Sequence, residues 1–95
     1  MKIEVTLDDQ PLGYIRRQAP DARKRLREAL HQVEAEERFP KALEDELDGF
    51  YKLSVDRFRL ILQAVSRRSG PGFRVVYCER RSVVYELFRQ TLGME

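Results

Sequence analysis

The chain has 95 residues, 42% of them hydrophobic and 36% charged, with one cysteine, one histidine and a formal net charge of +2. That length supports a single domain over residues 1–95, and the lone cysteine excludes an intrachain disulfide and indicates a reducing compartment. No apolar run approaches the ~20 residues that cross a bilayer. The first nine residues also lack the features of a signal peptide, so we expect a cytoplasmic protein with no membrane partner.

The first forty residues predict a strand followed by a helical hairpin. Residues 2–7 (KIEVTL) alternate apolar and polar side chains, as a β-strand does. Asp8 and Asp9 can then cap a first helix that Pro20 ends, and Pro20 can begin the next helix at its tolerated N-terminal position. A second helix follows until Phe39-Pro40, with one apolar stripe and charged residues on its other face. The stripe consists of Ala22, Leu26, Ala29, Leu30 and Val33.

Residues 42–50 form an acidic connector, and a strand pair is predicted after it. Residues 51–55 and 58–65 alternate in polarity around a tight turn near Asp56, with Leu53, Phe58 and Leu60 toward the core, and we also expect Tyr51 and Leu26 there. These two segments therefore predict antiparallel strands with one apolar face.

The C-terminal part of the chain predicts one more strand and a final element. Residues 66–72 (SRRSGPG) have the composition of a loop, and residues 73–80 (FRVVYCER) that of a strand. Residues 82–92 have the apolar spacing of a helix, although their valines also permit a strand. The order predicts the α+β class: an N-terminal strand, a helical hairpin, a three-stranded antiparallel continuation of the sheet and a short C-terminal helix.

Charge is divided unevenly along the chain. Residues 1–50 carry nine Lys and Arg against twelve Asp and Glu, a net charge of −3. Residues 51–95 carry nine against four, a net charge of +5. A basic half attracts polyanions even in a nearly neutral chain, although ordinary solubilising charges would give the same counts.

Several common kinds of active site are excluded by the residue types. The single histidine, His31, and the single cysteine, Cys78, are too few for a zinc site, and we expect His31 to be solvated on its helix. No glycine-rich phosphate loop follows a strand. The acidic residues 44–48 are typical of a solvated connector. We therefore expect neither a metal nor a cofactor.

A set of basic and aromatic residues remains on and beside the predicted strands. Its members are Tyr51, Lys52, Arg57, Arg59, Arg74, Tyr77, Arg80, Arg81 and Tyr85. Strand alternation puts Arg59 on the face of the sheet opposite to that of Phe58. Pairing around the turn puts Lys52 on the same face as Arg59, and we expect no helix to cover that face. Cations bind phosphate oxygens and aromatic rings stack on bases, which predicts a nucleic-acid surface. The alternative is a solvated face in which Lys and Arg stems cover apolar surface.

The order of elements and several segments resemble the RelE/ParE superfamily, the toxins of bacterial type II toxin–antitoxin systems. The segments are KLSVDRFRLIL at residues 52–62 and RRSVVYELF at residues 80–88, with LEDELDGFYKL at residues 43–53 leading into the first. The resemblance covers essentially the whole chain. It implies a metal-independent endoribonuclease, an mRNA interferase that cleaves mRNA on the translating ribosome and inhibits translation, with a cognate antitoxin protein as partner.

The resemblance also implies roles for individual residues in an attack of the RNA 2′-hydroxyl on the adjacent phosphate. Arg59 corresponds to the strand arginine that steadies the scissile phosphate, and Lys52 to a lysine that stabilises charge or aids the base. Tyr85 corresponds to a tyrosine that stacks on the base or assists proton transfer. Arg81 or Arg80 corresponds to an arginine that offsets charge in the transition state. The expected catalytic set is Lys52, Arg59, Arg81 and Tyr85, and the expected RNA-binding set is Arg57, Arg74 and Arg80.

The chain departs from the family pattern at two positions, which keeps alternatives open. Arg57 stands at the family's glycine, and Ser54 at its second basic residue. One alternative is a ParE-like toxin of the same fold that inhibits DNA gyrase by binding it. The other is a non-catalytic relative that binds nucleic acid. Tyr85 favours the nuclease, because gyrase-directed members generally lack this tyrosine.

Overall fold

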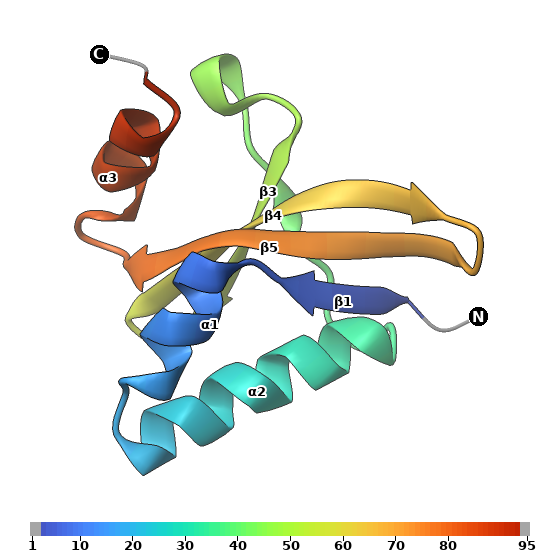
Figure 1. The fold of residues 1–95 in the computed structure, drawn as a ribbon, viewed down its shortest axis with the longest axis horizontal. Coiled ribbons are helices and arrows are strands. Elements are labelled where there is room, and N and C mark those ends of the chain that lie inside the picture. The colour runs from blue at the N-terminus through green and yellow to red at the C-terminus, as the bar shows by residue number, and fades with distance from the viewer. Residues whose placement is uncertain (1–2, 94–95) are drawn as a thin grey trace.

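The computed structural model describes residues 3–93, which form a mixed five-stranded sheet with helices on both faces (Figure 1). This arrangement confirms the predicted α+β class. The elements are β1 (Glu4–Leu7), α1 (Asp9–Arg16), α2 (Pro20–Glu34), β2 (Lys41–Ala42), the 3-10 turn η1 (Asp45–Leu47), β3 (Phe50–Val55), β4 (Phe58–Arg67), β5 (Gly70–Arg80) and α3 (Val84–Thr91). Lys2, which the sequence placed in the first strand, lies outside the described residues.

The strands lie in the order β1-β5-β4-β3-β2, with β1 parallel to β5 and the other neighbours antiparallel. The two-residue strand β2 was not predicted, because two residues are too few to show an alternating pattern. The predicted loop over residues 66–72 is wrong. Strands β4 and β5 continue through it to Arg67 and Gly70, which pair with each other across a two-residue turn. Cross-strand pairing there overrides a composition that is typical of loops.

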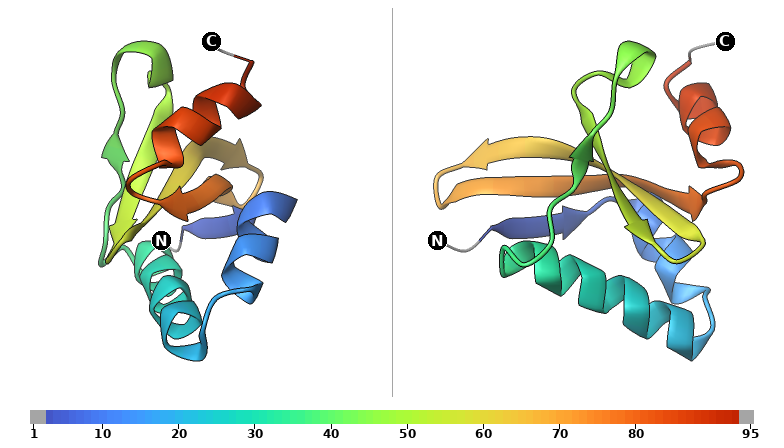
Figure 2. Two further views of the ribbon diagram at one scale, coloured as in Figure 1. Left: turned by 90° about the vertical axis from the view of Figure 1, so that its left-hand side faces the viewer. Right: turned by 180° about the vertical axis from the view of Figure 1, so that it is seen from behind.

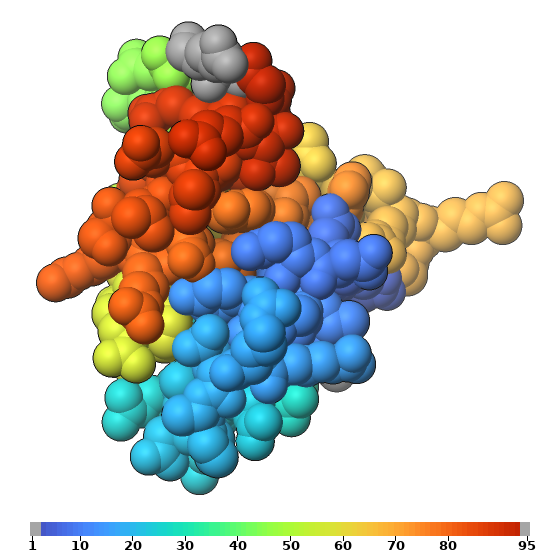
Figure 3. Space-filling view, turned by 60° about the vertical axis from the view of Figure 1, so that its left-hand side comes forward, coloured from blue at the N-terminus to red at the C-terminus, as the bar shows by residue number. Residues whose placement is uncertain are grey.

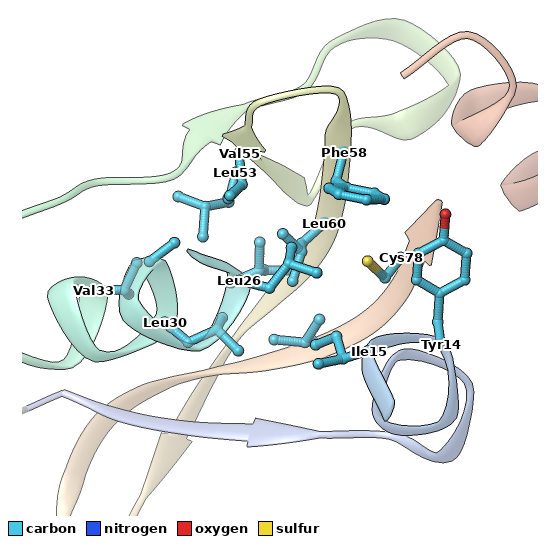
Figure 4. Close-up of a cluster of buried hydrophobic side chains, with 13 residues drawn as sticks. Tyr14, Ile15, Leu26, Leu30, Val33, Leu53, Val55, Phe58, Leu60 and Cys78 are labelled. Carbon is cyan, nitrogen blue, oxygen red and sulfur yellow. The ribbon is translucent and has the colours of Figure 1, made fainter. Parts of the chain in front are cut away.

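The helical hairpin covers one face of the sheet and buries the larger core cluster (Figure 4). Leu26 of α2 is fully buried against this face, as are Leu60 and Val75 from the central strands. The ring of Tyr14 from α1 contacts that of Phe58 edge to face, with centroids 6.1 Å apart. The predicted stripe of α2 is confirmed as the side that packs here, and Tyr51 packs at the cluster's border, partly buried.

The first helix is shorter than predicted. Pro20 was expected to end α1, which instead ends at Arg16. The expectation that Pro20 begins the next helix is confirmed, since it is the first residue of α2. Proline is tolerated at this first position because it has no N–H group to leave unsatisfied. The residues between the two helices form the bend of the hairpin. Within residues 3–93 no helix combines the length and apolar character needed to cross a bilayer.

The opposite face of the sheet is covered in part by α3, which the views in Figure 2 place across the sheet from α1 and α2. The C-terminal segment is therefore a helix, and the expectation that no helix covers this face is wrong for its central part. Val84 and Phe88, one turn apart on α3, pack on the fully buried Ile61. The Phe88 ring meets those of Phe50 and Tyr77, with centroids 5.1 and 5.6 Å away.

Candidate nucleic-acid interface

Lys52 and Arg59 lie on the same face of the sheet, the face that carries α3. Lys52 of β3 pairs with Ile61 of β4, and Arg59 precedes Ile61 by two residues on the same strand. Diagonal neighbours of this kind are typically about 7–8 Å apart. The shared face predicted from strand alternation is therefore present.

The guanidinium of Arg59 is oriented by backbone carbonyl groups of the β3–β4 turn. Its Nη1 atom donates to the Asp56 carbonyl oxygen at 2.9 Å and to the Phe58 carbonyl oxygen at 2.7 Å. These bonds use the two N–H groups of Nη1 and leave Nε and Nη2 available to a ligand. The Asp56 carboxylate is paired with Arg25 at 2.9 Å, so it does not neutralise Arg59. The group therefore points toward the turn and away from Lys52, whose partner Ile61 lies two residues farther from the turn than Arg59. Part of its hydrogen-bonding capacity is unused.

Three exposed arginines gather where β5 ends beside the β3–β4 turn. The backbone N–H of Arg81 donates to the Arg57 carbonyl oxygen at 2.8 Å, and Arg80 pairs with Phe58 in the sheet. Figure 3 shows this end of β5, in orange, next to the turn and below α3. The guanidinium carbon of Arg57 lies 5.3 Å from the Phe58 ring centroid, a cation–π distance. Within residues 3–93 these arginines form no ion pair, and they make this end strongly positive.

Arg74 is held apart from this group. Its Nε and Nη2 atoms donate to the two carboxylate oxygens of Asp8 at 2.7 and 2.8 Å. The hydrogen bonds from Arg74 lower the pKa of Asp8 below its ordinary value. At about 3.3 Å per strand residue, Arg74 is roughly 20 Å from Arg80 along β5. The structure therefore does not bring Arg74 together with the other predicted RNA-binding residues.

Tyr85 lies on α3, half-buried at the border of the cluster formed by Leu47, Ile61, Val84 and Phe88. Ile61 is also the cross-strand partner of Lys52. Tyr85 and Lys52, which are 33 positions apart in the sequence, therefore flank one small apolar cluster. The ion pair of Arg89 with Glu46, at 3.0 Å, ties α3 to η1 and helps to hold Tyr85 at this border.

Two residues beside β3 were missed in the sequence. Lys41 of β2 stands directly opposite Lys52, and Phe39 precedes it by two positions, with 69% of its surface exposed. Lys41 follows Pro40 in a segment without periodicity, so only the sheet pairing reveals its neighbour. In the sequence, the only signal of this surface was the dipeptide Phe39-Pro40 just before Lys41.

The single histidine and the single cysteine do not belong to this surface. His31 is exposed on α2, as expected, and its Nδ1 lies 3.0 Å from the Glu34 carboxylate. Burial raises the pKa of the Cys78 thiol to about 12, which makes it a poor nucleophile. Among residues 3–93, no group of three or more His, Cys, Asp or Glu side chains is arranged to hold a metal ion.

No protein-family model matches the chain, and no curated protein matches it in sequence. The resemblance to the RelE/ParE toxins thus rests on the order of the elements and on the segments around Lys52, Arg59 and Tyr85. Separately from this resemblance, the structure places Lys52 and Arg59 on one sheet face and brings the backbones of Arg57 and Arg81 together at the sheet end.

Proposed function

We propose that this protein is a RelE/ParE-type toxin that acts as a metal-independent endoribonuclease on mRNA in the translating ribosome. One observation carries the proposal: Lys52 and Arg59 share a sheet face beside the arginine-rich sheet end, and neither is paired with a carboxylate in residues 3–93. Cations that form no ion pair favour a polyanionic ligand, and within the described residues Lys52 and Arg59 remain without one although Glu79 stands opposite Arg59 in the sheet. The family resemblance supports RNA as that ligand.

The reaction proposed is attack of a ribose 2′-hydroxyl on its own 3′-phosphate. The 2′-hydroxyl loses its proton as its oxygen bonds to phosphorus, and the 5′-oxygen of the next nucleotide takes up a proton as its bond to phosphorus breaks. A 2′,3′-cyclic phosphate and a free 5′-hydroxyl result. Charge accumulates on the phosphoryl oxygens in the transition state, and fixed cations stabilise it. Lys52 and the free Nε and Nη2 groups of Arg59 are assigned to these oxygens.

Arg81 and Tyr85 complete the proposed site. Arg80 pairs with Phe58, so its side chain leaves the sheet on the side of the helical hairpin, away from Arg59. This favours Arg81 over Arg80 as the arginine that offsets transition-state charge. Tyr85, beside the cluster that Lys52 also borders, is assigned to stacking on a base or to proton transfer.

The test is cleavage of mRNA on programmed ribosomes, mapped by primer extension. Arg59→Ala should lower the cleavage rate about a hundredfold or more, because it removes one preorganised contact to the developing charge. Lys24→Ala removes one exposed cation from α2, which packs on the opposite face of the sheet, and is the matched control. Cleavage unchanged by Arg59→Ala would refute the nuclease. DNA breaks without RNA cleavage would instead indicate gyrase inhibition.

The proposal includes an antitoxin, and the helical hairpin has a groove suited to one. The groove, of about 390 Å³, lies between β1, α1 and α2. Its lining combines apolar side chains with two arginines: Val5, Leu7, Leu12, Ile15, Arg16, Arg27, Leu30, His31 and Glu34. An amphipathic antitoxin segment with acidic residues would complement both features.

The antitoxin assignment is tested by co-purification with the product of the neighbouring gene. The variant Leu12→Glu with Arg16→Glu places two negative charges at the groove and should abolish the complex. Gln90→Glu, at an exposed position of α3 across the sheet from the groove, should leave the complex intact. Equal retention of the partner by both variants would contradict the groove as its binding site.

A further inference from the structure

Two lysines face each other across the edge of the sheet without relief of their charge. Lys41 and Lys52 are direct partners in the antiparallel pairing of β2 with β3. Like charges at directly opposite positions destabilise a sheet, since their Cβ atoms are only about 5 Å apart. Neither lysine has an ion pair or a hydrogen-bonded side-chain partner within residues 3–93. Such a pair is relieved when one anion binds between the two ammonium groups.

An exposed aromatic ring lies beside this pair. Phe39 is 69% exposed, the highest value among the large hydrophobic residues described, and it belongs to neither core cluster. The residue before a proline is held extended, so alternation through Pro40 puts Phe39 on the same face as Lys41. Nη2 of Arg38 donates to the Ser54 carbonyl oxygen at 2.6 Å and holds this segment against β3.

The register then defines a continuous strip of surface. Continued by two residues, the pairing of Lys41 with Lys52 sets Phe39 beside Ser54, and Ser54 pairs with Arg59 in the sheet. Ser54 is small and exposed, so it forms a low floor between Phe39 and the stem of Arg59, whose guanidinium turns toward Asp56. The bulk of α3 covers Ile61 and Tyr77 and limits the strip on its other side.

We propose that Phe39, Lys41 and Lys52 form a nucleotide subsite for single-stranded RNA. One base stacks on the Phe39 ring, and its phosphate binds between Lys41 and Lys52, next to the phosphate held by Arg59. Stacking on a protein ring requires a base that is free of its own helix, which selects single strands over duplexes. The subsite rests on the proposed nuclease function and extends its substrate contact by one nucleotide.

The test uses a short 2′-fluoro RNA, which lacks the attacking hydroxyl, carrying 2-aminopurine as a stacking reporter. Binding is followed by fluorescence anisotropy, and stacking by quenching of the 2-aminopurine. Phe39→Ala should weaken binding on the order of tenfold and remove the quenching, while Phe39→Tyr should keep both. Phe39→Leu keeps an apolar side chain without a ring and should also lose the quenching. The Phe39 side chain is exposed, so the thermal unfolding temperature of these three variants should be unchanged.

Lys41→Ala tests the phosphate contact separately. It should weaken binding to every sequence and reduce the slope of log affinity against log salt by about 0.7, the value for one phosphate of a single strand. Lys24→Ala removes one positive charge from α2, and it should change the affinity and the salt slope less than Lys41→Ala does. The subsite is overturned if the unaltered protein does not bind the oligonucleotide. It is also overturned if Phe39→Ala weakens duplex and single-strand binding equally.

The two proposals fail in different ways. If Phe39→Ala and Lys41→Ala leave RNA binding and ribosomal cleavage unchanged while Arg59→Ala abolishes cleavage, the subsite is wrong and the nuclease stands. If Arg59→Ala and Lys52→Ala also leave cleavage unchanged, the nuclease itself is wrong. Loss of cleavage in all four variants, with Lys24→Ala active, supports both.

Discussion

The side-chain amide of Gln10 pairs with the backbone of Cys78 as a neighbouring strand would. Its Nε2 donates to the Cys78 carbonyl oxygen, and its Oε1 accepts from the Cys78 N–H, each at 2.8 Å. Strand β1 ends at Leu7, opposite Val75, and the chain then turns into α1. Beyond that point β5 has no strand partner on this edge, and Gln10 instead satisfies the backbone N–H and carbonyl groups of Cys78.

Gln10→Ala should therefore lower the free energy of unfolding by about 1–3 kcal/mol, because it leaves a partly buried donor and acceptor without partners. Urea denaturation measures this loss. Gln18 is the matched control, since its amide makes one bond of 3.2 Å, to the Tyr14 carbonyl oxygen within the same helical region. Gln18→Ala should cost less than about 0.5 kcal/mol. Equal losses in the two variants would contradict the bridging role of Gln10.

Gly72 allows β1 to approach β5 closely. A Cβ atom at this position would lie 2.6 Å from the Glu4 carbonyl oxygen, so Gly72→Ala must displace the β1 backbone. We expect a loss of about 1–3 kcal/mol and faster hydrogen exchange at the Asp8 amide, which donates to Val75. Gly13→Ala, in α1, meets only the flexible end of Arg17 and should stabilise by about 0.5–1 kcal/mol. Similar effects in both variants would count against the β1 contact.

Phe88 attaches α3 to the sheet. Its ring is 2% exposed and packs against Phe50 and Tyr77, and α3 is only eight residues long. Isolated helices of that length are unstable in water, so Phe88→Ala should detach α3 before the sheet unfolds. Limited trypsin digestion followed by mass spectrometry should show early cleavage at Arg89. Leu92→Ala, at an exposed position just after the helix, should leave Arg89 protected from trypsin. Arg89 remaining protected in Phe88→Ala would refute the prediction.

Cys78 should make the protein sensitive to alkaline pH. Burial raises the pKa of its thiol from about 9 to about 12, so the unfolded chain ionises first as the pH rises. Stability contributed by this group is present below pH 9 and is lost as the pH rises toward 12, by about 1 kcal/mol at pH 10. Urea denaturation at pH 8 and pH 10 measures the loss. Cys78→Val has a side chain of similar size without the thiol, so its free energy of unfolding should fall less between pH 8 and pH 10. An equal fall in the two proteins would show that the Cys78 thiol is not the group responsible.

Strand alternation predicted part of the candidate surface correctly. Lys52 and Arg59 share a face because side chains alternate with a period of two and the turn at Asp56 sets the register. The same reasoning missed Lys41, whose strand is too short to show a period. It also could not show that Arg74 is bound by Asp8, since that ion pair joins residues 66 positions apart.

The sequence by itself determined the class of fold, the apolar stripe of α2 and the facing of the β3–β4 pair, because each depends on local periodicity. Tertiary structure alone decided that α3 covers Ile61, that Gln10 completes the edge of β5 and that Lys41 opposes Lys52. These relationships join segments distant in the chain. Their geometry follows from how the layers pack, which no local pattern of residues records.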